Sequence, residues 1–70
     1  MSDVRSRFGK RLRAIRKNKG MSQETLALDA GLDRSYVGGV ERGERNISIE
    51  NMAKLARALK VKLLELLRDV

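Results

Sequence analysis

The sequence predicts an all-α fold in which five short helices share one small core. Apolar residues recur at three- and four-residue spacing along the chain, and no stretch shows the alternation typical of a β-strand. Gly20, Gly31 and Gly43 each close one of these patterns, as expected of residues that follow a helix end. The 70 residues are enough for one domain, spanning 1–70. A polar residue suited to cap the next helix follows each glycine, namely Ser22, Asp33 and Ser48.

The first predicted helix spans about residues 4–19. One face is basic and carries Lys10, Arg13 and Lys17. The opposite face is apolar, and we expect it to pack into the core because its members recur at helical spacing. These apolar residues are Val4, Phe8, Leu12 and Ile15.

Two helices of about eight residues follow, at about 23–30 and 34–42, and the tight turn 30–33 joins them. So short a connection predicts an angled pair of helices, the arrangement of a helix-turn-helix. Neither helix is long enough to be stable alone in water, so tertiary packing must hold both. The apolar residues expected in the core are Leu26, Ala27, Ala30, Leu32, Val37 and Val40.

The last two predicted helices span about 49–59 and 63–69. Both show an apolar face at helical spacing, and we expect both faces to complete the core. The first contributes Met52, Leu55, Ala56 and Leu59, and the second contributes Leu63, Leu66, Leu67 and Val70.

The composition argues against several classes of protein. Cysteine and histidine are both absent, so we expect no disulfide, no zinc site and no histidine general base. No acid–base pair or activated nucleophile is evident, and we therefore predict a protein without enzymatic activity, cofactor or small-molecule substrate. No apolar run approaches the roughly 20 residues of a membrane span, and the N-terminus does not resemble a signal peptide. We expect a soluble, cytoplasmic protein with no membrane partner.

The charge is concentrated at one end of the chain. Residues 1–20 hold eight Lys and Arg against one acid, whereas residues 21–70 hold eight of each sign. The net charge of +7 therefore belongs entirely to the first helix and its flanks. A polyanion such as nucleic acid is the partner that this distribution favours.

The second helix of the angled pair has an outward face suited to DNA. Helix-turn-helix proteins place this helix in the major groove. With Val37 and Val40 directed inward, a rotation of about 100° per residue gives an outward face that is small and basic. Such a face can lie against base edges without a clash. Its members are Arg34, Ser35, Tyr36, Gly39 and Arg42.

Four segments resemble the phage repressor/Cro helix-turn-helix family, also called the xenobiotic-response-element (XRE) family. They are residues 21–27 (MSQETLA), 30–32 (AGL), 40–43 (VERG) and 55–59 (LARAL), and the resemblance extends from about Phe8 to Leu67. It implies a five-helix, lambda-repressor-like domain that binds double-stranded DNA and regulates transcription, with its helix-turn-helix at about 22–42. Residues 33–37 (DRSYV) and 41–46 (ERGERN) also resemble the controller proteins of restriction–modification systems.

The resemblance implies a role for each matching position. Arg34 would read bases at the start of the recognition helix, where its guanidinium can donate two hydrogen bonds to O6 and N7 of guanine. Ser22 and Gln23 would hold a phosphate at the N-terminus of the preceding helix, which favours anions. The other base-reading positions implied are Ser35, Tyr36 and Gly39, and the other backbone-contacting positions are Arg42, Arg45 and Asn46.

Two further features follow from the comparison with that family. Arg16 and Glu41 resemble a buried ion pair that joins the first helix to the third. Gly38 and Gly39 depart from the usual pattern, because glycine inside a helix costs about 1 kcal/mol relative to alanine. We expect these glycines to permit close approach of the helix backbone to DNA, and a weakly formed helix is the alternative.

The C-terminal helix carries a candidate dimer contact. Leu64 falls outside the apolar stripe of that helix, and Val61, Val70 and Ala53 are expected nearby. Members of the resembled family commonly associate through this helix. A two-fold homodimer would present two recognition helices about 34 Å apart and would require a palindromic operator.

Two other functions remain open from the sequence. The chain could be an antitoxin-like or other protein-interaction module, or its basic first helix could bind RNA or anionic lipid. The last alternative does not explain the outward face of the third helix. The operator sequence and the choice between activation and repression are not determined by these residues.

Overall fold

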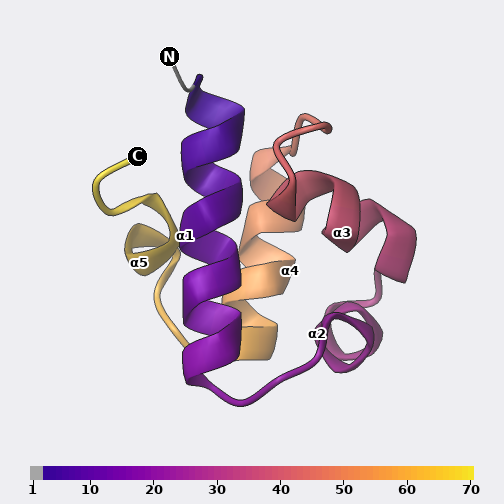
Figure 1. Ribbon diagram of the computed structural model, residues 1–70. Helices are drawn as coiled ribbons and strands as arrows, with labels where there is room; N and C mark the ends of the chain where they lie inside the picture. Colours follow the sequence, from indigo (N-terminus) through magenta and orange to yellow (C-terminus); the bar gives the residue numbers. More distant parts are fainter. Residues whose placement is uncertain (1–2) are drawn as a thin grey trace.

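The structure is a computed structural model that describes residues 3–70 and is all-helical over that range (Figure 1). This confirms the predicted fold class and all five predicted helices. Three of the helices end one or two residues earlier than the sequence indicated. The helices are α1 (Val4–Asn18), α2 (Gln23–Ala30), α3 (Arg34–Glu41), α4 (Ile49–Leu59) and α5 (Leu63–Leu67).

Local signals fix the connection between α2 and α3. The Ser22 hydroxyl accepts a hydrogen bond of 3.0 Å from the Thr25 amide at the start of α2. Gly31 ends α2 in the left-handed region with φ of 71°, a conformation that costs glycine little. Asp33 occupies the N-cap position of α3 with extended backbone, but its side chain forms no capping hydrogen bond. The turn therefore depends on Gly31 and on packing more than on the predicted Asp33 cap.

Side-chain caps begin both α1 and α4. The Asp3 side chain caps α1, and the Ser6 amide together with the Arg5 guanidinium lowers the pKa of that carboxyl. Ser48 caps α4 as predicted, accepting from the Asn51 amide at 3.1 Å. At its other end, α4 stops at Lys60, which adopts a left-handed φ of 59° without being glycine.

The core lies where all five helices meet. Helix α1 packs against α3 and α5, α2 packs against α3 and α4, and α4 packs against α5 (Figure 1). Two predicted core positions are wrong, because Val4 is 57% exposed and Leu67 is 39% exposed. Val4 begins α1 and Leu67 ends α5, so each has packing partners on one side only. The fully buried large side chains are Leu12, Leu26, Leu55, Leu59, Leu66, Val37 and Val40.

Helix α1 crosses the end of α3 at very short range, and Gly9 makes this possible. A Cβ atom at position 9 would collide with the carbonyl oxygens of Val40 and Glu41. Backbone carbonyl groups in a helix cannot move aside cheaply, so any side chain at position 9 would push the two helices apart. No local pattern in the sequence indicates this requirement, because it depends on residues about 30 positions away.

A buried ion pair joins the same two helices. Arg16 Nε donates to Glu41 Oε2 at 2.7 Å, and Arg16 Nη2 donates to Glu41 Oε1 at 3.0 Å. The Arg16 Nη1 group donates to the Met21 carbonyl, and Gln23 Nε2 donates to Glu41 Oε1 at 2.9 Å. The two residues are each 7% exposed, and no buried side-chain polar atom among residues 3–70 is left without a partner.

We predict that Glu41→Ala lowers the free energy of unfolding by about 3–5 kcal/mol, because it strands the Arg16 charge in a buried site. Urea or thermal unfolding followed by circular dichroism measures this. Glu44→Ala is the matched control, because Glu44 pairs with Arg42 at the surface and such pairs contribute about 0–1 kcal/mol. Equal melting temperatures for Glu41→Ala and the unmodified protein would contradict the prediction.

Candidate nucleic-acid interface

The first turn of α3 presents two polar side chains to solvent. Arg34 and Ser35 are both exposed, and within residues 3–70 neither side chain forms a hydrogen bond or ion pair. Val37 and Val40 on the opposite side of the same helix are fully buried. Helix α3 therefore has the predicted orientation, with its apolar side in the core and the start of its polar side available to a ligand.

Tyr36 is half-buried and joins three parts of the chain. Its hydroxyl accepts from Asn51 Nδ2 of α4 at 3.2 Å and donates to the Asn46 carbonyl at 3.4 Å. The Arg45 guanidinium lies 5.7 Å from the ring centroid, in the range of a cation–π contact. These contacts fix the ring beside the exposed turn of α3. Asn51 is a partner that the sequence analysis missed, because nothing local to it signals this contact.

Arginine side chains cover the two glycines of α3. A Cβ atom at Gly39 would lie 2.8 Å from Cγ of Arg45, and one at Gly38 would lie 3.1 Å from Nη1 of Arg42. The expectation that Gly39 lies open on the outward side is therefore wrong, because the Arg45 side chain packs across it. Both glycines are buried in this arrangement. A base-reading role for Gly39 stays a prediction that requires Arg45 to move.

Two hollows beside α3 hold five of the predicted contact residues. Gln23 and Arg42 line one hollow, and Ser35, Tyr36 and Arg45 line the other. Ser22 and Asn46 line neither hollow, so the predicted DNA-contacting residues are only partly gathered beside α3. Helix α1 contributes Lys10 and Arg13 to the first hollow, and α4 contributes Asn51 to the second.

Several predicted backbone-contacting residues already have partners within the chain. The Ser22 hydroxyl donates to Thr25 Oγ1 at 3.0 Å while it caps α2. Arg42 Nε donates to Glu44 at 3.1 Å on the surface. Gln23 is tied to the buried ion pair through its amide nitrogen. Contact with a phosphate therefore involves a rearrangement of exposed side chains, but the backbone amides that begin α2 need not move.

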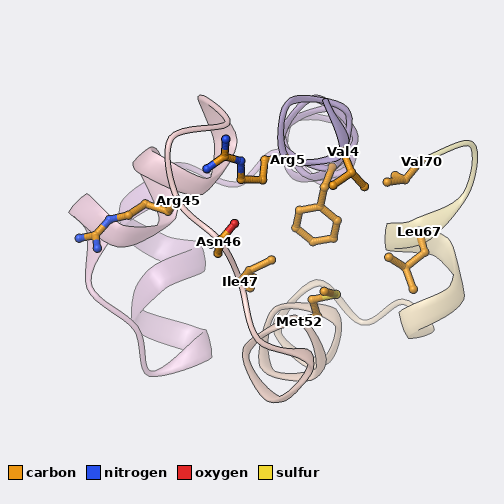
Figure 2. Close-up of a pocket in the computed structure, with 9 residues that line it drawn as sticks. Val4, Arg5, Arg45, Asn46, Ile47, Met52, Leu67 and Val70 are labelled. Carbon is orange, nitrogen blue, oxygen red and sulfur yellow. The ribbon is translucent and has the colours of Figure 1, made fainter. Parts of the chain in front are cut away.

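The predicted dimer contacts do not form one patch. Leu64 is 67% exposed, whereas Val61 and Val70 are partly buried and pack against the core. Val61 and Val70 also line separate hollows, the first beside α1 and the second in an apolar pocket of about 250 Å³. Figure 2 shows Val4, Leu67 and Val70 facing this pocket from the two ends of the chain. The sequence analysis did not predict the pocket.

The described residues show neither a metal-binding cluster nor a membrane span. Among residues 3–70, no group of three or more Asp, Glu, His or Cys side chains could hold a metal ion. No described helix is both long enough and apolar enough to cross a bilayer.

Comparison with known proteins gives the same family that the sequence resembles. A helix-turn-helix family model matches residues 12–66. The chain is 41% identical to the control protein C.MunI of Mycoplasma sp. over 71 residues, which cover 100% of this chain and 96% of that protein. It is 43% identical to the control protein C.BamHI of Bacillus amyloliquefaciens, over 94% of this chain and 83% of that protein.

A solved structure agrees in fold as well as in sequence. The crystal structure of the restriction–modification controller protein C.AhdI from Aeromonas hydrophila matches with a TM-score of 0.88 and 61% identity. The match covers 89% of this chain and 94% of that one. The chain therefore belongs to the XRE-type helix-turn-helix family and is a DNA-binding transcription regulator.

Proposed function

We propose that this regulator binds a palindromic operator as a homodimer, with α3 of each protomer in the major groove. The observation that carries the proposal is the exposed, unpaired first turn of α3, where Arg34 and Ser35 project from a helix that is held from behind by the core. A two-fold dimer would place these turns about 34 Å apart, one turn of DNA. The protein would act on chromosomal or phage DNA in the prokaryotic cytoplasm.

The residues around α3 divide between base reading and backbone binding. Arg34 would donate to O6 and N7 of guanine, and Ser35 and Tyr36 would contact neighbouring base or sugar edges. Gly39 would also contact bases when the Arg45 side chain, which covers it, moves away to bind a phosphate. Contacts to phosphates set the register of the protein but carry no sequence information. We assign these to Ser22, Gln23, Arg42, Arg45 and Asn46.

We further propose that the chain controls a restriction–modification system. The support is its similarity, over nearly its full length, to C.MunI, C.BamHI and C.AhdI, all of which are named as control or controller proteins. Residues 33–37 and 41–46, which resemble such controllers, lie in and directly after the proposed recognition helix. A controller of this kind would act on transcription, as a repressor or an activator.

The dimer contact that we propose is centred on Leu64. A leucine with two thirds of its surface exposed on the C-terminal helix can pack against its own symmetry mate in a two-fold interface. Val61 and Val70 are partly buried and line separate hollows, so they would add apolar area to this contact only after a side-chain rearrangement.

Selection of bound sequences from random DNA tests the proposed function and is expected to return a palindrome. On the selected operator, Arg34→Ala should lose about 1–3 kcal/mol of discrimination at one base pair of each half-site. Arg45→Ala should weaken all sequences equally and lower the magnitude of the salt slope by about 0.9 per protomer. Arg57→Ala, an exposed arginine that lines neither hollow beside α3, controls for loss of charge. Equal losses for Arg34→Ala on the operator and on scrambled DNA would remove Arg34 from base reading.

Leu64→Glu is expected to convert the dimer to a monomer and to weaken operator binding, because two carboxylates would be forced into one apolar contact. Sedimentation equilibrium gives the mass, and the same samples are used for DNA binding. Leu28→Glu is the control for the mass, because Leu28 is 80% exposed and lies on α2, away from α5. An unchanged mass and unchanged operator binding in Leu64→Glu would show that the interface lies elsewhere.

A further inference from the structure

The cations of α1 differ in whether the protein itself neutralises them. Three arginines are paired with carboxylates, at distances of 2.7–3.4 Å. Arg7 donates to the Val70 carbonyl at 3.3 Å and is likewise engaged. These contacts hold α1 against its own N-cap, α3, and the C-terminal segment. The paired arginines are Arg5 with Asp3, Arg11 with Glu65 and Arg16 with Glu41.

The remaining face of α1 carries Lys10, Arg13 and Lys17, which we call the α1 ridge. All three are exposed, and none lies within ion-pair distance of a carboxylate of residues 3–70. Their three- and four-residue spacing places them on one face of the helix, where like charges repel one another. With Ala14 they line one shallow hollow, which shows that the three side chains are neighbours. The ridge is thus a strip of positive charge that the rest of the described chain leaves uncompensated.

The α1 ridge is continuous with the helix-turn-helix. Lys10 and Arg13 line a second hollow together with Gln23, at the first turn of α2, and Arg42, directly after α3. The N-terminus of α2 adds the positive end of a helix dipole to the same region. Among residues 3–70, Glu41 supplies the one carboxylate that lines this hollow, and Arg16 and Gln23 already hydrogen-bond to it. Cationic side chains therefore line the surface from Arg42, which is paired with Glu44, across to α1.

We propose that the α1 ridge binds the DNA phosphate backbone beside the operator half-site, on the α2 side of the recognition helix. The proposal rests on the function proposed above, because α3 in the major groove brings the hollow shared with the ridge to the adjoining backbone. It extends the contact surface of the protein beyond the helix-turn-helix. Phosphate contacts are independent of sequence, so the ridge would contribute affinity and salt dependence but not specificity.

The test compares two variants with the same loss of charge. The ridge variant carries Lys10→Gln, Arg13→Gln and Lys17→Gln. The control variant removes two lysines and one arginine from exposed positions that line neither hollow beside α3. Affinity for the selected operator and for a random duplex is measured over a series of salt concentrations, and thermal melting checks the fold of each protein. The control substitutions are Lys54→Gln, Arg57→Gln and Lys60→Gln.

Each phosphate contact contributes about 0.9 to the slope of log affinity against log salt. The ridge variant lacks three cations, so we expect the magnitude of its slope to fall by about 2 to 3 per protomer on both duplexes. Its preference for operator over random DNA should stay unchanged, and the control variant should keep the slope of the unmodified protein. The charge-conserving variant Lys10→Arg with Lys17→Arg should also keep that slope. This last variant changes the side chains but keeps their charge, so it shows whether the charge itself determines the slope.

Two results would overturn the proposal. Identical slopes for the unmodified protein and the ridge variant would show that the ridge does not touch DNA. Equal losses in the ridge and control variants would show an effect of net charge alone. Failure of the proposed function is distinguishable, because it appears as an unmodified protein that does not prefer the selected operator. The slopes on random duplex then still decide whether the ridge binds phosphate.

Discussion

The ion pair between Arg16 and Glu41 is the constraint on which the arrangement of α1, α2 and α3 depends. It lies beneath the last turn of α3, and Gln23 at the first turn of α2 donates to the same carboxylate. Gly9 lets the α1 backbone approach α3 closely enough for the pair to form at 2.7 Å. Such a buried pair adds little net stability, but separating its partners is costly, because each would leave an uncompensated buried charge. The inner end of α3 is therefore fixed. In the first turn, Tyr36 and Val37 contact the rest of the protein, so the Arg34 and Ser35 side chains are presented without contacts of their own.

This construction separates the residues that hold the protein together from those available to a ligand. The buried valines of α3 and the ion pair face inward, while Arg34 and Ser35 make no contact that DNA would have to break. The same separation applies to α1, where the arginines facing the protein are paired and the ridge is not. A rigid helix with a free polar side is what base reading needs, because ordering flexible groups on binding costs free energy. The surrounding cations then supply attraction that does not depend on sequence.

Features set by local chemistry could be predicted from the sequence, whereas features set by distant neighbours could not. The turn at Gly31 and the extent of α2 follow from residues within a few positions of each other. The cover that Arg45 places over Gly39 depends on the path of the loop after α3, which leaves no local pattern. Exposure of Val4 and Leu67 depends on where the two chain ends meet, so helical periodicity alone assigned both to the core wrongly. The exposure of the first turn of α3 was predictable, because the inward valines fix the rotation of the helix about its axis. The side-chain contacts around that turn were not predictable.

The central claim is that the first turn of α3 reads guanine in the major groove. Methylation of guanine N7 on the selected operator tests this most directly, because N7 lies in the major groove and is the acceptor proposed for Arg34. We expect that methylation of one guanine in each half-site abolishes binding by the unmodified protein and has little further effect on Arg34→Ala. Binding that is indifferent to N7 methylation throughout the operator would contradict base reading by α3.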